Sequence, residues 1–302
     1  MIENNVQCPI CSRTDLRCKP FGYLYKNRWL GAIECMTCKI IFIHPQPTEQ
    51  EIASLYSKEY FEHDFRCGHA GSYFDDAALE KLSEDKLLYR FKQFKTDGTF
   101  LEVGCAGGAF LNTLRKAGYN VHGVELSSEA AQLARERFNL DVRVGDLISA
   151  QYPDGMFDLV YMGDVLEHIP NPNAILKEIH RIMKPGGILG IRCPMQTNTL
   201  FSRIGFMAYS LLGKKATVHL PPYHLFEYRP KSFAHLLNLH RFEVTILNQT
   251  IMSPSEISLR GSTIERMMKK IFQYQNVAIT RILKVFGDRV EIFATKVDNV
   301  PT

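Results

Sequence analysis

Two pairs of cysteines, each with the spacing C-x2-C, are the first candidates for chemistry in this chain. Cys8 pairs with Cys11 and Cys35 with Cys38, and 23 residues separate the pairs. Each pair can bring two thiolates to one ion, and four thiolates complete a tetrahedral zinc site with no open position. A redox C-x-x-C is the alternative, but it normally opens a helix in a strand–helix–strand unit, and neither pair does. We therefore expect a structural zinc ion.

A turn of small residues follows a buried strand expected over 99–103 and precedes a helix. The small residues of this turn are Gly104, Ala106, Gly107 and Gly108. A backbone without bulky side chains can approach a ligand closely there, and the helix N-terminus alone would favour an anionic group. A dinucleotide-binding fingerprint would require glycine at positions 104, 106 and 109, but 106 and 109 are alanine. The pattern is instead acid-x-Gly-x-small-x-Gly, beginning at Glu102, and an acid suits a cationic ligand.

Two further acids stand at expected strand ends. Glu125 comes about twenty residues after the turn, where the ribose-binding acid of a strand–helix–strand unit is expected. Its carboxylate could accept both ribose hydroxyls and would repel a 2′-phosphate, so NADP is disfavoured. Asp146 follows the next strand, within Val144-Gly145-Asp146-Leu147.

Together these segments resemble the class I, Rossmann-like, S-adenosylmethionine-dependent methyltransferases over roughly residues 98–250, with the motifs in the expected order. The resemblance implies S-adenosyl-L-methionine as cofactor, since its sulfonium and amino groups are cationic, with Asp146 reaching the exocyclic amine of the adenine. The cofactor-binding residues that it implies are Glu102, Gly104, Ala106, Gly108, Glu125, Leu126, Asp146, Leu147 and Gly163.

A zinc ribbon ahead of such a core resembles bacterial methyltransferases of nucleotide-linked deoxysugars and surface polysaccharide precursors, which implies a small-molecule acceptor. It is similar, more loosely, to ribosomal RNA methyltransferases with an N-terminal zinc ribbon. Residues 1–47 carry six Lys or Arg against three Asp or Glu, and the whole chain has a formal charge of +4, so a nucleic-acid partner is not expected. A third alternative is a non-catalytic binding module, against which Glu102, Glu125 and Asp146 argue.

The acceptor side holds four candidate catalytic residues. Methyl transfer is an in-line displacement that needs alignment and exclusion of water, and a base only when the acceptor must lose a proton. His224 is the predicted base or pocket residue, and Tyr223, His219 and His168 are the next candidates. Alternatively, His224 anchors the turn before the next helix and His168 is a hydrogen-bonded residue at the core rim. Asp158 is expected to be structural.

The elements that must position these residues follow from hydrophobic periodicity. From residue 99 onward, strands alternate with helices, which predicts an α/β fold. We expect a doubly wound, mostly parallel seven-stranded sheet with an antiparallel last strand, plus the small N-terminal zinc ribbon. The expected strands are 99–103, 121–125, 142–144, 157–162, 188–193, 242–248 and 290–295, and the expected helices are 108–117, 128–138, 172–183 and 231–239.

Three regions are predicted along the chain. They are a zinc ribbon over 1–47, a helical linker region over 48–97 and a methyltransferase domain over 98–302 with insertions at 195–228 and 250–287. Prolines at 45 and 47 mark the first seam, and Thr48-x-x-Glu51 resembles a capping box that opens a helix. A second helix, carrying apolar residues from Leu79 to Phe94, should precede the domain.

The second insertion predicts a basic amphipathic helix. Such a helix can lie on a membrane surface or a lipid-linked substrate, but packing on the domain or on a partner subunit, as in a homodimer, is favoured. The chain has neither a signal-peptide pattern nor an apolar run near the ~20 residues of a membrane span. We therefore expect a cytoplasmic protein, in which the eight cysteines do not form a disulfide framework.

Overall fold

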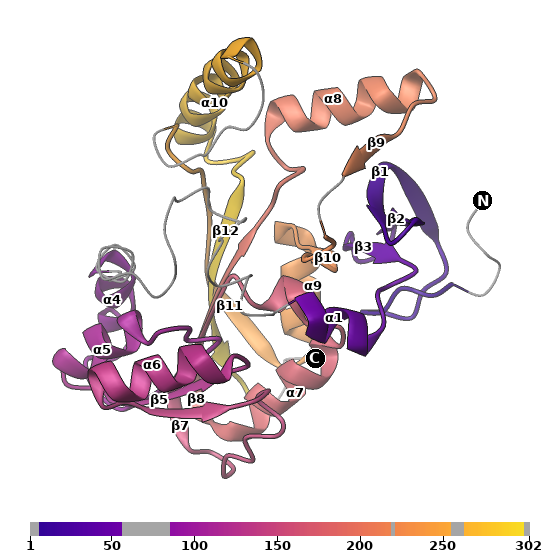
Figure 1. Cartoon of the computed structure of the whole chain (residues 1–302). Helices are drawn as coiled ribbons and strands as arrows, with labels where there is room; N and C mark the ends of the chain where they lie inside the picture. Colours follow the sequence, from indigo (N-terminus) through magenta and orange to yellow (C-terminus); the bar gives the residue numbers. More distant parts are fainter. Residues whose placement is uncertain (1–5, 56–84, 219–220, 255–262, 299–302) are drawn as a thin grey trace.

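The computed structural model describes residues 6–55, 85–218, 221–254 and 263–298, and it contains two β-sheets (Figure 1). The larger sheet has seven strands in the order β11-β12-β8-β7-β4-β5-β6. Neighbouring strands are parallel except where β12 meets β8 and β11, to which it is antiparallel. The predicted doubly wound sheet with an antiparallel last strand is thus confirmed. Its strands are β4 (Thr99–Val103), β5 (Asn120–Glu125), β6 (Asp141–Val144), β7 (Phe157–Gly163), β8 (Met183–Pro194), β11 (Phe242–Thr250) and β12 (Arg289–Lys296).

Helices cover both faces of this sheet, and each face has its own apolar core. One face is covered by α7 (Pro172–Ile182) and α9 (Pro230–Leu239), and the other by α4 (Asp85–Lys92), α5 (Ala109–Lys116) and α6 (Ser128–Phe138). The chain order reverses between the neighbouring strands β4 and β7, which is where an open α/β sheet places its ligand.

Local sequence explains where α7 begins. The side chain of Asn171 caps the helix by accepting a hydrogen bond from the Ala174 amide at 3.1 Å, and Pro172 occupies the first turn. Apolar residues at helical spacing face the core and are buried. They are Ile175, Leu176, Ile179 and Ile182.

The second sheet has five strands in the order β10-β3-β2-β1-β9. The N-terminal segment supplies β1 (Leu16–Tyr25), β2 (Arg28–Cys35) and β3 (Ile41–His44). The two edge strands come from the insertion predicted at 195–228. They are β9 (Ala216–Val218), parallel to β1, and β10 (Phe226–Glu227), antiparallel to β3. The ribbon is therefore completed by residues nearly two hundred positions away in the chain.

The ribbon and the larger domain also share one hydrophobic core. Cys8, Ile10 and Phe42 of the ribbon belong to the same buried cluster as Leu176 of α7. The side-chain amide of Asn173 on α7 donates hydrogen bonds to the backbone carbonyls of Pro9 at 3.0 Å and Ile10 at 3.2 Å. The first cysteine knuckle is thus held directly against a helix of the larger domain.

The linker region is described only in part. The predicted capping box is present, since the Thr48 amide donates to Glu51 at 3.0 Å and the Glu51 amide donates to Thr48 Oγ1 at 3.2 Å. It opens α1 (Glu49–Leu55). Of the second predicted helix, α4 is present, whereas its proposed apolar residues Leu79 and Leu82 lie outside the described residues.

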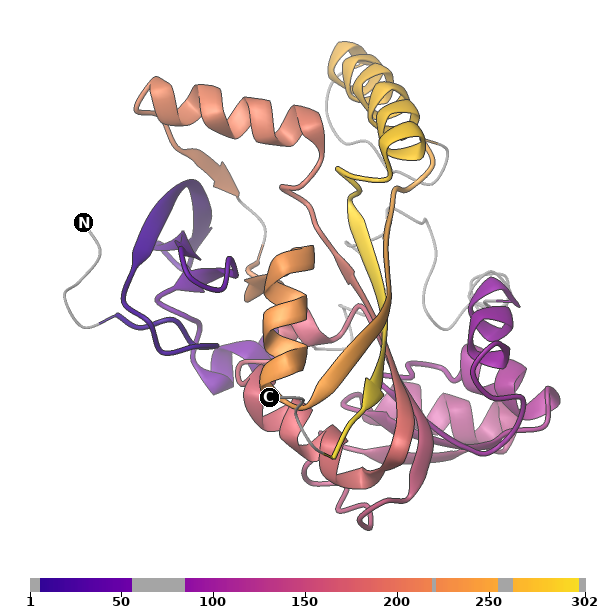
Figure 2. The same ribbon diagram turned by 180° about the vertical axis from the view of Figure 1, so that it is seen from behind.

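Two helices, α8 (Leu200–Leu211) and α10 (Thr263–Leu283), project beyond the two sheets (Figures 1 and 2). α8 touches the smaller sheet through Phe206, whose ring centroid lies 5.0 Å from that of Phe21 on β1. None of the residues of α8 is buried, and the described buried residues of α10 are Asn276, Val277 and Thr280. The predicted packing of α10 on the domain therefore holds for one narrow stripe only. Apolar side chains on both helices stay exposed, among them Met207, Leu211, Met267, Tyr274 and Ile282. No helix in the described residues has the length and apolar character needed to span a membrane.

Candidate functional site

The candidate cofactor residues meet at the carboxyl ends of β4, β5, β6 and β7. In the parallel pairing of β4 with β5, Val103 lies opposite Val124, and the Gly104 amide donates to the Val124 carbonyl at 2.8 Å. In the pairing of β5 with β6, Glu125 lies opposite Val144. The register therefore brings the small-residue turn and both strand-end acids to one edge of the sheet.

The turn after β4 uses left-handed backbone three times, at Gly104 (φ 74°), Ala106 (φ 47°) and Gly108 (φ 77°). A side chain at Gly104 would place its Cβ only 2.5 Å from Cγ2 of Val165, so the position needs glycine for space as well as for conformation. Ala106 is held in this conformation by a hydrogen bond, since its amide donates to Glu125 Oε2 at 2.8 Å.

Glu125 joins this turn to the next one. Its Oε1 accepts a hydrogen bond from the Ser127 amide at 3.0 Å, and the side chain is buried. A carboxylate accepts several hydrogen bonds, and these two come from the backbone of two different loops. The side chain thus shapes both loops.

Negative charge dominates the floor of this site. Glu102 and Glu125 are both buried, at 7% and 6% exposure. Burial raises the pKa of the nearby Cys105 thiol well above its usual value, and the charges of Glu102 and Glu125 raise it further. Cys105 is therefore neutral, and the electrostatic environment suits a cationic ligand, not a pyrophosphate.

Apolar side chains flank the end of β6. Leu126, Val144 and Ile148 are exposed by 59%, 46% and 50%, around the turn that holds Asp146. Asp146 Oδ1 accepts a hydrogen bond from the Ser149 amide at 2.7 Å, so it caps this turn with one carboxylate oxygen. Leu147 is fully buried, so only its main-chain atoms can reach a ligand.

Gly163 ends β7 near the same edge and packs closely on the side chain of Tyr161. A Cβ at this position would lie only 2.6 Å from the tyrosine hydroxyl. Asp158, at the opposite end of β7, is an anchor, as predicted. It accepts hydrogen bonds from Lys184 at 2.7 Å, from the Thr99 amide at 2.9 Å, and from Lys95.

The acceptor candidates gather beyond β7. A short 3-10 helix, η1 (Leu166–His168), places His168 beside His224, with ring centroids 4.8 Å apart. His168 Nδ1 lies 2.6 Å from the carbonyl oxygen of Tyr223. Three of the four predicted residues are thus together, whereas His219 lies outside the described residues.

One residue of this cluster was missed by sequence reasoning. Glu167 is fully buried, and its Oε1 lies 3.5 Å from His168 Nε2. A glutamate in the first turn after a strand reads as a surface residue. The segment 221–225 folds over it, and the Leu225 amide donates to the Glu167 carbonyl at 2.9 Å.

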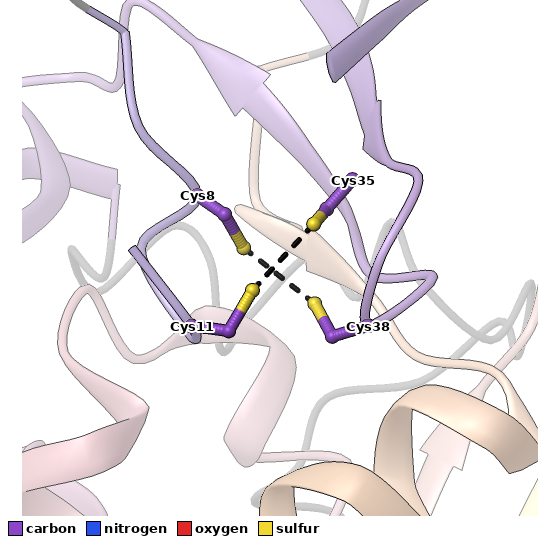
Figure 3. A group of neighbouring side chains, drawn as sticks. All are labelled: Cys8, Cys11, Cys35 and Cys38. Carbon is purple, nitrogen blue, oxygen red and sulfur yellow. Dashed lines mark hydrogen bonds between the residues drawn. The ribbon is translucent and has the colours of Figure 1, made fainter. Parts of the chain in front are cut away.

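The four ribbon cysteines point toward a common centre (Figure 3). Their sulfur atoms all lie within 4.8 Å of one another, with 3.5 Å between Cys8 and Cys38 and 3.6 Å between Cys11 and Cys35. Four sulfurs at 2.3 Å from one zinc ion are about 3.8 Å apart, so the arrangement fits a tetrahedral site. The hydrogen bond between the two thiols lowers the pKa of Cys8 and raises the pKa of Cys38, as expected for two sulfurs that share one proton.

The two knuckles repeat the same backbone pattern. The Cys8 amide donates to the Arg13 carbonyl and the Cys35 amide to the Ile40 carbonyl, each five residues on and each at 2.9 Å. The residue after each second cysteine, Ser12 or Lys39, is left-handed, with φ of 57° and 64°. Such matched turns present two pairs of sulfurs in one geometry, which is what a four-thiolate site requires.

Comparisons with known proteins agree with this architecture. Residues 101–191 match the family described as "Methyltransferase domain". The ubiquinone biosynthesis O-methyltransferase of Hydrogenovibrio crunogenus is 35% identical over 118 residues, covering 36% of this chain and 48% of that protein. The 2-methyl-6-phytyl-1,4-hydroquinone methyltransferase of Synechocystis is 31% identical over 159 residues, 48% of each chain. Phosphoethanolamine N-methyltransferase 2 of Caenorhabditis elegans is 32% identical over 109 residues, 34% of this chain and 25% of that protein.

The chain therefore spans less than half the length of each of these curated relatives. A solved chain from the complex of the Haloferax volcanii Trm112 methyltransferase activator with a methyltransferase has the same fold, with a TM-score of 0.50 and 17% identity over 75% of this chain and 95% of that one. Residues 101–191 are thus similar to methyltransferase domains, and the seven-stranded sheet has the fold of that solved chain. The family match does not include the cysteine pairs.

Proposed function

We propose that this protein transfers the methyl group of S-adenosyl-L-methionine to a small-molecule acceptor. The observation that carries the proposal is the position of Glu125, buried at the end of β5 and bonded to the left-handed turn at Ala106. Its carboxylate would accept the ribose hydroxyls. Glu102 would supply negative charge for the amino and sulfonium groups, and Asp146 would accept the adenine amine beside Leu126.

The reaction is an in-line displacement at carbon. A lone pair of the acceptor forms a bond to the methyl carbon while the carbon–sulfur bond breaks, and its electron pair stays on sulfur as S-adenosylhomocysteine leaves. A hydroxyl or amine acceptor also gives up a proton. The chain's part is to align the two reactants and exclude water, and to handle that proton.

The acceptor would bind beside His168, Tyr223 and His224, at the same edge of the sheet as the cofactor. We propose an activated sugar or polysaccharide precursor as the first acceptor class, on the resemblance of the ribbon and core. A phenolic quinol precursor is the second candidate, because the relatives named above include a ubiquinone biosynthesis O-methyltransferase and a hydroquinone methyltransferase. RNA is disfavoured by the weakly basic ribbon.

We also propose that Cys8, Cys11, Cys35 and Cys38 hold one structural zinc ion. Four thiolates fill all four positions of the ion, which leaves none for a substrate. The ion would hold the ribbon in its folded conformation. The ribbon in turn is hydrogen-bonded to α7 through the side chain of Asn173.

Release of S-adenosylhomocysteine from the full chain tests the activity. The panel would contain nucleotide sugars, phenolic quinol precursors and structured RNA, each with wild type and with Glu125→Ala. We expect release above background with one sugar or phenol class, and its loss in the variant. Release with RNA alone would contradict the small-molecule assignment. Failure of all acceptors, together with failure to bind the cofactor, would contradict methyl transfer itself.

A further inference from the structure

The carboxylate of Glu167 is buried beside two histidines. Among the described residues, neither of its oxygens has a hydrogen-bond partner. Transfer of an ionised carboxylate out of water is costly unless it is paired or coordinates a metal. Glu167 is fully buried, and the two imidazoles of His168 and His224 are the nearest groups that could share a cation with it.

The orientation of His168 leaves one nitrogen facing this carboxylate. A carbonyl oxygen can only accept a hydrogen bond, so at 2.6 Å from the Tyr223 carbonyl Nδ1 must carry the hydrogen. Nε2 then points toward Glu167. A histidine that donates one ring N–H to a backbone carbonyl and turns its other nitrogen inward has the usual arrangement of a metal ligand.

Distances separate a metal site from a simple ion pair. A charge-assisted N–H···O bond is about 2.7–2.9 Å long, whereas His168 Nε2 and Glu167 Oε1 are 3.5 Å apart. Two ligand atoms at about 2.0–2.1 Å from one zinc ion, at a tetrahedral angle, are about 3.4 Å apart. One ligand atom from each of Glu167, His168 and His224 lies within 4.8 Å of the others.

We propose that Glu167, His168 and His224 bind a divalent transition-metal ion, with zinc as the best match to two imidazoles and one carboxylate. Three protein ligands leave at least one position open, unlike the four-thiolate site. This proposal rests on the proposed function and narrows it, because the open position at the carboxyl edge would take an oxygen of the acceptor. A hydroxyl bound to such an ion loses its proton more readily, so the acceptor nucleophile would be oxygen. His224 would then act as a ligand, not as the base.

Cobalt is a probe that distinguishes the two sites. The full chain is treated with a chelator, its remaining zinc is measured, and Co²⁺ is then added while visible absorption is recorded. Cobalt bound by thiolates has intense charge-transfer absorption, which a nitrogen–oxygen site lacks. We expect wild type to bind one equivalent of Co²⁺ that gives no thiolate charge-transfer bands. Any Co²⁺ that replaces zinc in the cysteine site would be bound in addition and would give those bands. Glu167→Gln and His224→Ala should lose that equivalent, and the control His235→Ala, an exposed histidine on α9, should keep it.

Circular dichroism and calorimetry with S-adenosyl-L-methionine accompany each variant. His224 is only partly buried, so His224→Ala serves if Glu167→Gln does not fold. Cofactor binding without the extra cobalt equivalent in wild type, or the same equivalent retained in His224→Ala, would overturn the metal site and leave the methyltransferase proposal standing. Failure to bind the cofactor would contradict the proposed function, whatever cobalt does.

Discussion

Glu125 and Glu167 show what sequence reasoning can find at the scale of a residue. Glu125 was predictable because its distance from the small-residue turn and its place at a strand end are both local features. Glu167 follows β7 in the same local way, but it is covered by a segment more than 50 residues later, where the Tyr223 carbonyl meets His168 and the Leu225 amide donates to the Glu167 carbonyl. No local pattern marks a carboxylate that only tertiary folding encloses.

His224→Ala is expected to lower turnover by about 10²–10⁴-fold, the range for loss of a group that assists proton removal from the acceptor, whether as a base or as a ligand of the proposed ion. Cofactor affinity should stay near that of wild type, because His224 lies beside η1 and apart from the turn at Ala106. Steady-state turnover and calorimetry, compared with His235→Ala, measure the two effects. Near-normal turnover in His224→Ala would show that alignment alone suffices, or that another residue carries the proton.

Gly104→Ala tests the turn. The new Cβ would lie 2.5 Å from Val165 on a left-handed backbone, so the turn must shift. We expect cofactor affinity to fall at least tenfold, a change of about 1.4 kcal/mol. Gly155→Ala is the control, since Gly155 is also left-handed (φ 58°) but has open space around it. Equal affinity losses in the two variants would mean that the close approach at Gly104 does not matter.

At the scale of elements, long periodic segments were predictable and short pairings were not. The helix predicted over 128–138 has the same bounds in α6, because Ser127 caps it and alanines at helical spacing are buried. β9 and β10 have three and two residues, too few for any alternation to be read. β8 begins at Met183, five residues before the predicted strand, because the Lys-Pro-Gly-Gly segment is held in the sheet by the pairing of Met183 with Phe157.

Asp158 ties β7 to β4 through charge, which gives a pH prediction. Burial works against its ionisation, but Lys184, Lys95 and the Thr99 amide lower the pKa of Asp158 to about 2. A pKa below the unfolded value of about 3.9 means that the stabilisation is complete above pH 4 and is lost as the pH falls toward 2. Asp158→Asn should therefore lower the urea midpoint at pH 7, and the gap to wild type should narrow by pH 3. A constant gap would contradict the ion-pair account.

At the scale of the whole molecule, the ribbon is not an independent appendage. The proline-rich seam after His44 was predicted, and β3 ends at that residue. The sequence did not indicate that the insertion at 195–228 would close both edges of the ribbon sheet, because strand pairing across such a separation leaves no periodic signal. The segment between β9 and β10 carries Tyr223 and His224, so the ribbon and the acceptor side depend on each other.

Loss of the ribbon's metal should therefore affect the acceptor side more than the cofactor side. Cys38→Ser removes one of the four thiolates, so we expect the thiolate site to hold less than one equivalent of zinc. The ribbon should then become less ordered, because so short a segment cannot form a stable core without the ion. Turnover should drop severalfold while the cofactor still binds, because β4, β5 and β6 lie away from the ribbon. Cys18→Ser, an exposed cysteine on β1, is the control. Full turnover in zinc-free protein would contradict this coupling.

Calorimetric titration of the full chain with S-adenosyl-L-methionine tests the central claim most directly. We expect one site per chain, and affinity lower by about 10–100-fold in Glu125→Ala, since hydrogen bonds to a charged group contribute about 1.5–3 kcal/mol. Glu125→Gln, which keeps the size of the side chain, should also bind more weakly, and Glu136→Ala, an exposed residue of α6, should bind like wild type. No binding by folded wild type, or equal affinity in wild type and both Glu125 variants, would contradict the assignment of the site.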